Sequence, residues 1–151
     1  MSPASAPAST RRRTLITGKI HRVTVTGADL DYVGSITIDV TLLRAADILP
    51  GEQVDVVNVN TGARLTTYAI PGEAGSGSVV LNGAAAHYFG AGDIAIIMCY
   101  GTMSDAEARS FEPHIVFVDG RNHIVERGVE PGQVPDGYGL SSSGIPVADT
   151  R

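Results

Sequence analysis

Cysteine, aromatic residues and long apolar runs are all scarce in this sequence of 151 residues. Cys99 is the only cysteine, which excludes an internal disulfide and a metal site built from several cysteines. Its position at the end of the apolar run 94–99 favours a place in the core over the role of a nucleophile. No apolar run approaches the length needed to cross a membrane, so we expect no membrane partner.

Basic residues are also in the minority, with 11 Lys and Arg against 16 Asp and Glu and a formal net charge of -5. This balance lacks the broad basic surface of nucleic-acid-binding proteins, and the cluster Arg11-Arg12-Arg13 is more typical of a solvated tail. The cluster follows an Ala-, Ser- and Pro-rich start instead of preceding an apolar stretch, which argues against a signal peptide. We therefore expect a cytoplasmic protein with no nucleic-acid partner.

Short runs of Val, Ile and Thr, broken by many of the 18 glycines, predict a mainly β fold. Three short helices are expected, after an N-cap at Asp39, after Asn82, and after Ser104, which opens a capping box. The expected strands cover residues 15–26, 36–38, 54–59, 64–70 and 79–81, and a closing hairpin covers 111–118 and 123–125.

The length suits one domain, which we place at residues 14–127. Residues 1–13 are expected to form a flexible N-terminal extension, and the Gly-, Pro- and Ser-rich residues 128–151 a flexible tail. A faint internal repeat is present, because a Gly-acid-x-apolar pattern follows a helix-like segment both at Gly51 and at Gly92. The repeat would fit a small barrel made of two interlocked halves, although chance similarity explains it nearly as well.

The peptide bond between Gly34 and Ser35 is poorly shielded against attack by its own side chain. Gly34 has no Cβ beside its carbonyl, and the Ser35 hydroxyl could attack that carbonyl and move the acyl group from nitrogen to oxygen. Elimination from the resulting ester, followed by hydrolysis, would leave a pyruvoyl group that serves as an electron sink for a bound amine. Gly-Ser pairs are also common turn residues, so the pair alone does not decide between chemistry and a turn.

Four short segments occur together in this chain: Gly18-Lys19-Ile20-His21-Arg22, Tyr32-x-Gly34-Ser35, Arg64-x-x-Thr67-Tyr68 and Asn82-Gly83-Ala84-Ala85-Ala86-His87. In this order and spacing, the chain resembles the aspartate 1-decarboxylases over roughly residues 13–125. These pyruvoyl-dependent enzymes make β-alanine for pantothenate and coenzyme A synthesis. The resemblance implies a small six-stranded double-psi β-barrel with short helices, and a homotetramer with sites between neighbouring subunits.

Position by position, the resemblance implies self-cleavage between Gly34 and Ser35, with Ser35 becoming the pyruvoyl group that forms a Schiff base with L-aspartate. Tyr68 matches the proton donor, and Thr67 matches the residue that assists the cleavage and contacts the substrate. The other substrate contacts implied are Lys19, Arg64, Asn82, Gly83, Ala84 and Ala85. Some relatives have Cys directly after the cleaved Ser, where this chain has Ile36, a residue outside the leaving chemistry.

Decarboxylation of aspartate requires a proton donor and a cation, and the sequence offers both. A phenol with an ordinary pKa of about 10 stays protonated at neutral pH, so Tyr68 could return a proton to the product carbanion. The planar guanidinium of Arg64 could hold the side-chain carboxylate with two hydrogen bonds, and Lys19 would give a looser second contact. Each of the three is also an ordinary strand residue when taken alone. His87, His114 and His123 show no metal-ligand spacing, and no metal is expected.

Two other functions stay open at the level of sequence. The chain could be a non-catalytic barrel that acts as a binding or assembly module with Gly34-Ser35 intact, or a pyruvoyl decarboxylase for another amino acid. The sequence does not decide whether cleavage needs a helper protein. It also leaves His21 open, because that residue could contact the site or make an ordinary hydrogen bond at a strand edge.

Overall fold

Nine strands, two short α-helices and one 3-10 helix form the part of the chain, residues 9–135, that this computed structural model describes. The strands are β1 (Arg12–Thr24), β2 (Gly27–Asp29), β3 (Ser35–Asp39), β4 (Gln53–Asn58), β5 (Arg64–Gly72), β6 (Val79–Asn82), β7 (Ile94–Ser104), β8 (His114–Val118) and β9 (Ile124–Gly128). The helices are α1 (Val40–Ala45), η1 (Gly83–His87) and α2 (Asp105–Ala108).

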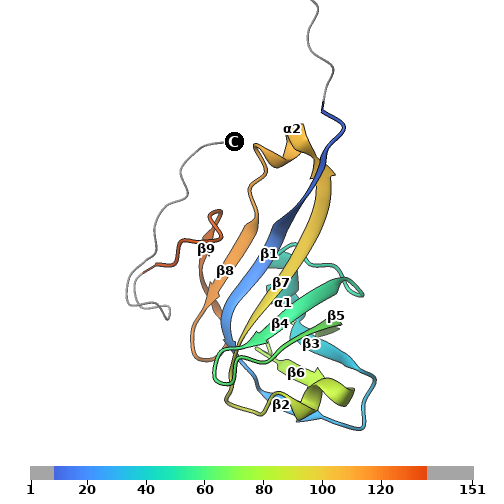
Figure 1. The fold of residues 1–151 in the computed structure, drawn as a ribbon. Coiled ribbons are helices and arrows are strands. Elements are labelled where there is room, and N and C mark those ends of the chain that lie inside the picture. The colour runs from blue at the N-terminus through green and yellow to red at the C-terminus, as the bar shows by residue number, and fades with distance from the viewer. Residues whose placement is uncertain (1–8, 136–151) are drawn as a thin grey trace, which may run out of the picture.

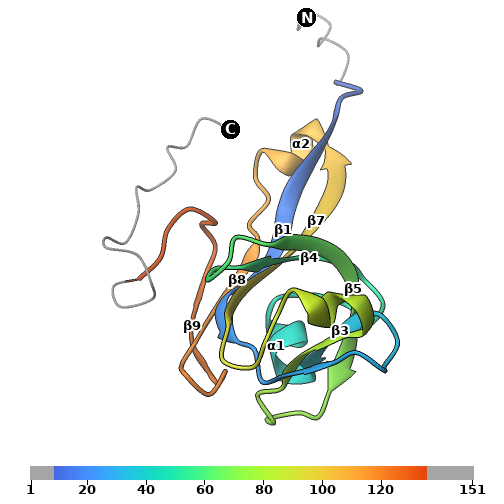
Figure 2. The same cartoon turned by 60° about the horizontal axis from the view of Figure 1, so that its bottom comes forward.

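The strands form one mixed sheet in the order β2-β6-β3-β5-β4-β7-β1-β8-β9. Three pairs are parallel, β1 with β8, β2 with β6 and β3 with β5, and the others are antiparallel. The long strands β1 and β7 run side by side with α2 at their outer end (Figure 1). Viewed from below, the sheet curls round as a small barrel (Figure 2). The prediction of a mainly β barrel is confirmed, with nine strands in the sheet where six were expected for the barrel.

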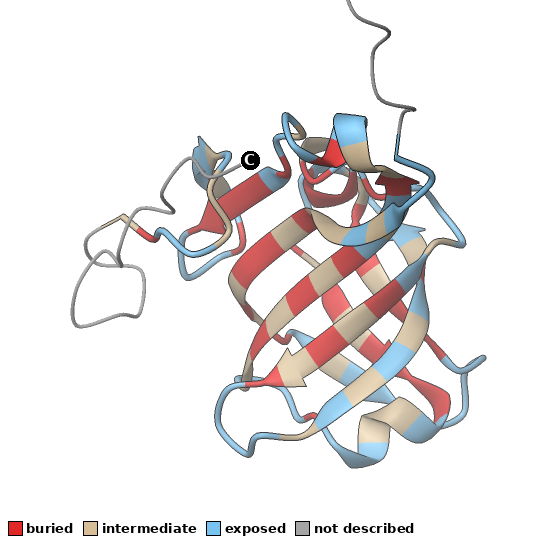
Figure 3. Ribbon diagram, turned by 45° about the horizontal axis from the view of Figure 1, so that its top comes forward, coloured by how far each residue is buried: buried red, intermediate tan, exposed pale blue. Residues whose placement is uncertain are grey.

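Buried residues alternate with more exposed ones along the strands (Figure 3). This period of two is what a sheet requires when one face is covered and the other meets water. The core is almost entirely aliphatic, with Ile20, Ile36, Ile38, Val56 and Ile97 fully buried. Such branched residues suit a pleated, tightly packed interior.

Local signals in the sequence fix the starts of the two α-helices as expected. The Asp39 carboxylate accepts a hydrogen bond from the Thr41 N–H at 2.8 Å and begins α1. The Ser104 hydroxyl accepts one from the Glu107 N–H at 3.1 Å and begins α2. Both side chains satisfy N–H groups that the helix itself leaves without a partner.

The faint repeat corresponds to a repeated order of elements. In the first copy, β3 leads into α1 and then through Gly51 to β4, and in the second, β6 leads into η1 and then through Gly92 to β7. Both glycines have positive φ, +83° and +92°. The strands that end the two copies, β4 and β7, are antiparallel neighbours. This arrangement favours a true repeat over chance similarity.

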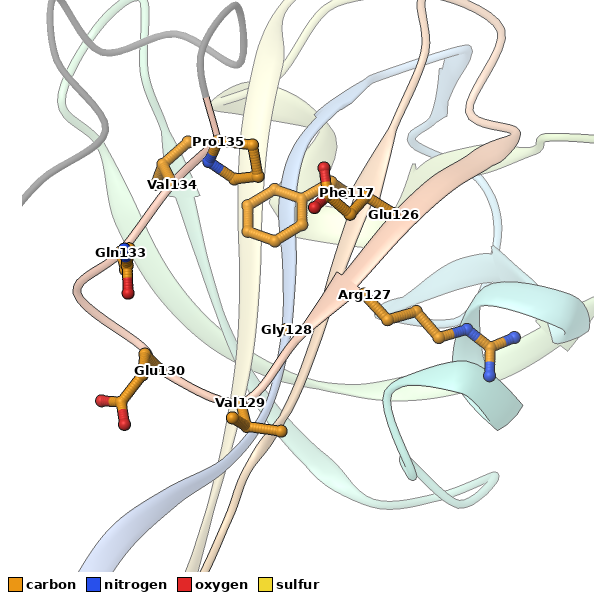
Figure 4. Close-up of a pocket in the computed structure, with 9 residues that line it drawn as sticks. All are labelled: Phe117, Glu126, Arg127, Gly128, Val129, Glu130, Gln133, Val134 and Pro135. Carbon is orange, nitrogen blue, oxygen red and sulfur yellow. The ribbon is translucent and has the colours of Figure 1, made fainter. Parts of the chain in front are cut away.

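The ordered strands extend beyond residues 14–127 at both ends. β1 begins at Arg12, and the Arg13 side chain bonds the Asp105 carboxylate at 2.6 Å. β9 runs to Gly128, and beyond it Val134 is buried in a cluster with Ile115 and Phe117. Figure 4 shows Val134 and Phe117 of this cluster. The sequence did not indicate these contacts, because one apolar residue in a Gly- and Pro-rich segment has no periodicity. The rest of the expected extension and tail, residues 1–8 and 136–151, lies outside the described residues.

Candidate active site

The bond between Gly34 and Ser35 lies where an exposed loop enters the sheet. Gly34 is exposed and Ser35, the first residue of β3, is fully buried. The loop before it carries Leu30, Tyr32 and Val33, which are 52–62% exposed. The peptide bond is therefore held on its serine side by the ladder that pairs Ser35 with Asn82 of β6.

The Ser35 hydroxyl is held by two hydrogen bonds. It donates to the Val33 carbonyl at 2.8 Å and accepts from Asn82 Nδ2 at 3.0 Å. The second N–H of the same amide donates to Thr37 Oγ1 at 2.9 Å. Asn82 is only 2% exposed, and a buried amide that uses both N–H groups cannot turn without losing a bond. Asn82 therefore orients the Ser35 oxygen.

Gly83 lies directly against Gly34. Its φ is +65°, in the left-handed region that favours glycine. A Cβ at this position would lie 2.6 Å from the Gly34 Cα and 2.8 Å from the Gly34 nitrogen. No side chain fits into that space without moving the backbone beside the Gly34–Ser35 bond, so the absence of a side chain at residue 83 is part of the site.

A cavity of about 320 Å³ opens beside Gly34. Its walls come from β5, from η1 and from the residue that follows η1. The lining residues are Gly34, Leu65, Thr66, Thr67, Ala84, Ala85 and Tyr88. The volume is at the lower end of the range of about 300–1,000 Å³ that is usual for ligand sites. The cavity can therefore take a small molecule next to the Gly34–Ser35 bond.

Lys19, Arg64 and Tyr68 do not line this cavity within one chain. Lys19 lies on β1, where its Nζ donates to the Pro131 carbonyl at 3.3 Å and burial lowers its pKa. Tyr68 follows Thr67 on β5, and its side chain is 36% exposed. The structure thus brings Gly34, Ser35, Thr67 and the segment 82–85 together, and leaves the other three predicted residues elsewhere.

Arg64 stands at the start of β5 in a polar cluster on the outer face of the sheet. Its Nη2 bonds the Asp55 carboxylate at 2.9 Å and the Tyr100 hydroxyl at 3.4 Å. The Thr66 hydroxyl also donates to Asp55, at 2.7 Å. The pKa of Asp55 is held below its ordinary value by this hydroxyl and, to a smaller extent, by the guanidinium. Arg64 is more than half exposed in spite of these bonds, so it remains accessible to an anion.

A family model described as aspartate decarboxylase matches residues 11–125 of this chain. The match includes every residue of the candidate site described above. The chain belongs to the aspartate decarboxylase family. The resemblance drawn from the four sequence segments is thereby confirmed, and aspartate is the substrate that membership of the family implies.

Sequence reasoning missed two residues of the candidate site. Thr37 shares the Asn82 amide with Ser35, and Tyr88 lines the cavity beside Gly34. The period of two in β3 could have pointed to Thr37, since residues 35 and 37 lie on the same face of a strand. No comparable signal pointed to Tyr88, because its position depends on how η1 folds back towards β5.

Two other groups that the sequence singled out lie in the interior of the protein. His21 is 5% exposed, and its ring meets the edge of Phe117 with the centroids 5.7 Å apart. Cys99 is fully buried, and burial raises the pKa of its thiol to about 11, so it is a poor nucleophile at neutral pH.

Among residues 9–135, no group of three or more His, Cys, Asp or Glu side chains is placed to hold a metal ion. Over the same residues, no helix is long and apolar enough to cross a membrane.

A second cavity, of about 330 Å³, lies between β8, β9 and the segment after β9. Figure 4 shows Glu126 and Glu130 around it, with Phe117 towards Val134 and Pro135. None of its lining residues belongs to the site around Ser35. The described residues that line it include two glutamates and no Ser, Cys, Asn, Thr or Tyr, so its chemistry differs from that of the first cavity.

Proposed function

We propose that this protein removes the α-carboxylate of L-aspartate to give β-alanine and CO₂, with a pyruvoyl group that the chain makes from Ser35 by cleaving itself after Gly34. The β-alanine would supply pantothenate and coenzyme A synthesis. The observation that supports the proposal is the Ser35 hydroxyl, which accepts a hydrogen bond from Asn82 and directly follows Gly34, a residue that lines a cavity of suitable size.

Cleavage begins with attack of Ser35 Oγ on the Gly34 carbonyl carbon. The C–N bond breaks and an ester forms, with a free amine on residue 35. Loss of the Ser35 α-proton then breaks the Cβ–O bond and releases the Gly34 carboxylate, which leaves a carbon–carbon double bond at residue 35. Water then hydrolyses the imine form of this residue, so that its nitrogen leaves as ammonia and the pyruvoyl carbonyl is formed. In the structure the Ser35 hydroxyl donates its proton to the Val33 carbonyl. Before the attack it must turn this proton towards a base, while the hydrogen bond from Asn82 can keep the oxygen in place.

Thr67 is the residue we assign to the oxyanion that forms on the Gly34 carbonyl. It lines the same cavity as Gly34, and its hydroxyl can donate one hydrogen bond. A donor aimed at such an oxyanion typically contributes about 10²–10³ in rate. The N–H groups of the neighbouring segment 83–85 are further candidate donors to substrate, because this segment lies against Gly34.

The pyruvoyl group supplies an electron sink for the substrate amine. The residues around it must then anchor the side-chain carboxylate, hold the α-carboxylate loosely enough to let it leave, and return a proton. We assign the anchor to Arg64 with Lys19, and the proton to Tyr68. A cation bound tightly to the departing carboxylate would stabilise the substrate more than the transition state, so the permanent side-chain carboxylate is the better partner for Arg64.

We further propose that these three residues reach Ser35 from a neighbouring copy in a homotetramer. Two observations support this. They do not line the cavity of their own chain. The loop that precedes Ser35 exposes three apolar side chains, as surfaces that bind another protein often do.

Intact mass spectrometry of the purified protein tests the proposal. We expect a fragment of residues 1–34 and a second fragment of residues 35–151 with a blocked N-terminus. Ser35→Ala is the matched control, and it should stay one chain and form no β-alanine. A wild-type chain that stays intact, alone and with a helper protein from the same cell extract, would contradict the proposal in favour of a non-catalytic barrel.

A further inference from the structure

Tyr88 has by far the largest side chain of the seven residues that line the cavity beside Gly34. Its neighbours in the wall are glycine, alanine, threonine and leucine, so its ring takes up more of the site than any other group. Tyr88 is 60% exposed, which places it where the cavity meets the solvent. A large group at this position limits what can enter and how far a bound molecule can extend.

The backbone at Tyr88 is fixed from both sides. Its N–H donates to the Ala85 carbonyl at 3.0 Å, and its carbonyl accepts from Asn58 Nδ2 at 3.0 Å. Asn58 is fully buried, and the same amide donates to the Asp93 carboxylate at 2.9 Å. Asp93 in turn accepts from the Gly90 N–H at 2.9 Å, which holds the turn after Tyr88. The wall is therefore anchored to β4 instead of resting on a free loop.

The walls of the cavity carry no charged residue. A cavity of this kind selects by volume and not by charge, and one methylene more or less in an apolar pocket changes specificity by about 10–200-fold. Charge would be recognised outside it, by the cations assigned above. Size and charge selection would then reside in different parts of the site.

We infer that Tyr88 is a specificity-determining residue that sets the maximum length of the dicarboxylic amino acid accepted, admitting the four-carbon substrate and excluding the five-carbon one. This inference rests on the proposed function. Removing the ring should leave space for one more methylene. The hydroxyl is not required for this role, because the limit comes from the volume of the ring.

The test compares wild type with Tyr88→Ala, and uses Tyr88→Phe as the matched control that keeps the ring. Intact mass first establishes that each protein is cleaved. Calorimetry then gives the Kd of succinate and of glutarate, which have no amine and differ by one methylene. We expect the preference for succinate to fall about tenfold or more in Tyr88→Ala, in line with the value of one methylene, and to stay unchanged in Tyr88→Phe. The kcat/KM ratio of L-aspartate to L-glutamate should change in the same direction.

An unchanged preference in cleaved Tyr88→Ala protein would overturn the inference while leaving the proposed function standing. A wild-type protein that stays uncleaved and converts no amino acid would overturn both. If Tyr88→Ala is poorly folded, Tyr88→Leu removes most of the ring and should shift the preference in the same direction. A shift in Tyr88→Phe as large as that in Tyr88→Ala would assign selectivity to the hydroxyl and contradict the role of volume.

Discussion

Two regions of this protein differ in how they hold their functional groups. The cleavage region, made of Gly34, Ser35, Asn82 and Gly83, is neutral and mostly buried, and backbone contacts and one amide hold it within a single chain. The cation region, made of Lys19, Arg64 and Tyr68, is partly exposed and lies on the strands β1 and β5. Within one chain the first region is assembled and the second is not.

The difference has a physical reason. Attack on a peptide bond needs atoms fixed to within a few tenths of an ångström, and close packing with buried hydrogen bonds provides this. Charged groups are costly to bury without a partner, and the Arg64 guanidinium, which is more than half exposed, stays accessible to an anionic substrate. Changes in the cleavage region should therefore affect maturation, and changes in the cation region should affect turnover by a protein that has matured normally.

The largest effect is expected from Tyr68→Phe. This change removes the transferable proton and keeps the ring, so cleavage should be normal while kcat falls about 10²–10⁴-fold, the usual contribution of a general acid. KM should change much less, because the interaction belongs to the transition state. Steady-state kinetics on protein checked by intact mass measures this. An unchanged kcat would assign the proton to another group or to water.

Thr67→Val should slow self-cleavage, the step that Tyr68→Phe leaves normal, although the two residues are adjacent in sequence. Valine keeps the shape of threonine and removes the hydroxyl, so self-cleavage should slow about 10²–10³-fold, the contribution of one oxyanion donor. The fraction of cleaved chain, followed by mass spectrometry over time, gives the rate. Cleavage at the wild-type rate would remove Thr67 from the cleavage step.

Arg64→Ala should lower kcat/KM for L-aspartate by about 10–100-fold, since a hydrogen bond to a charged group contributes about 1.5–3 kcal/mol. The advantage of aspartate over alanine should shrink with it, and cleavage should be unaffected. Arg109→Ala is the matched control, because Arg109 is also an exposed arginine bound to a carboxylate. Arg64→Ala protein that is cleaved and keeps the wild-type preference would contradict the role of Arg64 as the anchor.

Gly83→Ala should destabilise the uncleaved chain by about 1–3 kcal/mol, the usual cost of a non-glycine residue in strained backbone. The added Cβ also has to displace Gly34, so cleavage should slow. Urea unfolding in the Ser35→Ala background measures the stability of a chain that stays in one piece. Gly120→Ala is the control, because a Cβ there meets nothing within 4 Å.

The smallest effect is expected from Asp39, which ends the strand that Ser35 begins. Burial raises the pKa of its carboxyl, but hydrogen bonds from the N–H groups of Gly77, Thr41 and Gly75 outweigh this and lower it below the ordinary 3.8. The carboxylate therefore stabilises the folded chain above the pKa of the unfolded state, and this stability is lost as the pH falls through the folded pKa.

Asp39→Asn should accordingly be less stable than wild type near neutral pH, and the difference should narrow as the pH falls below about 4. Unfolding free energies of both proteins from pH 7 to pH 2 measure this. Asp31→Asn, a change in the exposed loop, serves as the control. A difference that stays constant down to pH 2 would show that the charge of Asp39 does not matter.

Local sequence patterns were enough to predict the mainly β class, the positions of most strands, and the helix starts at Asp39 and Ser104. These features depend on signals a few residues long, such as an alternation of apolar and polar residues or a capping side chain. Such signals do not depend on which strands are neighbours in the sheet. The same local signals, with the order of four short segments, pointed to the family and to Gly34, Ser35, Thr67 and Asn82.

Which of the named residues share a site depends on how the strands pair in three dimensions. Asn82 and Ser35 are 47 positions apart and meet because β3 and β6 are antiparallel neighbours. Tyr88 reaches the cavity because Asn58, on another strand, holds its carbonyl. Val134 is buried because β8 presents Phe117 to it. Contacts of this range depend on strand order and register, which no local pattern contains, since the same alternating strands could pair in many orders.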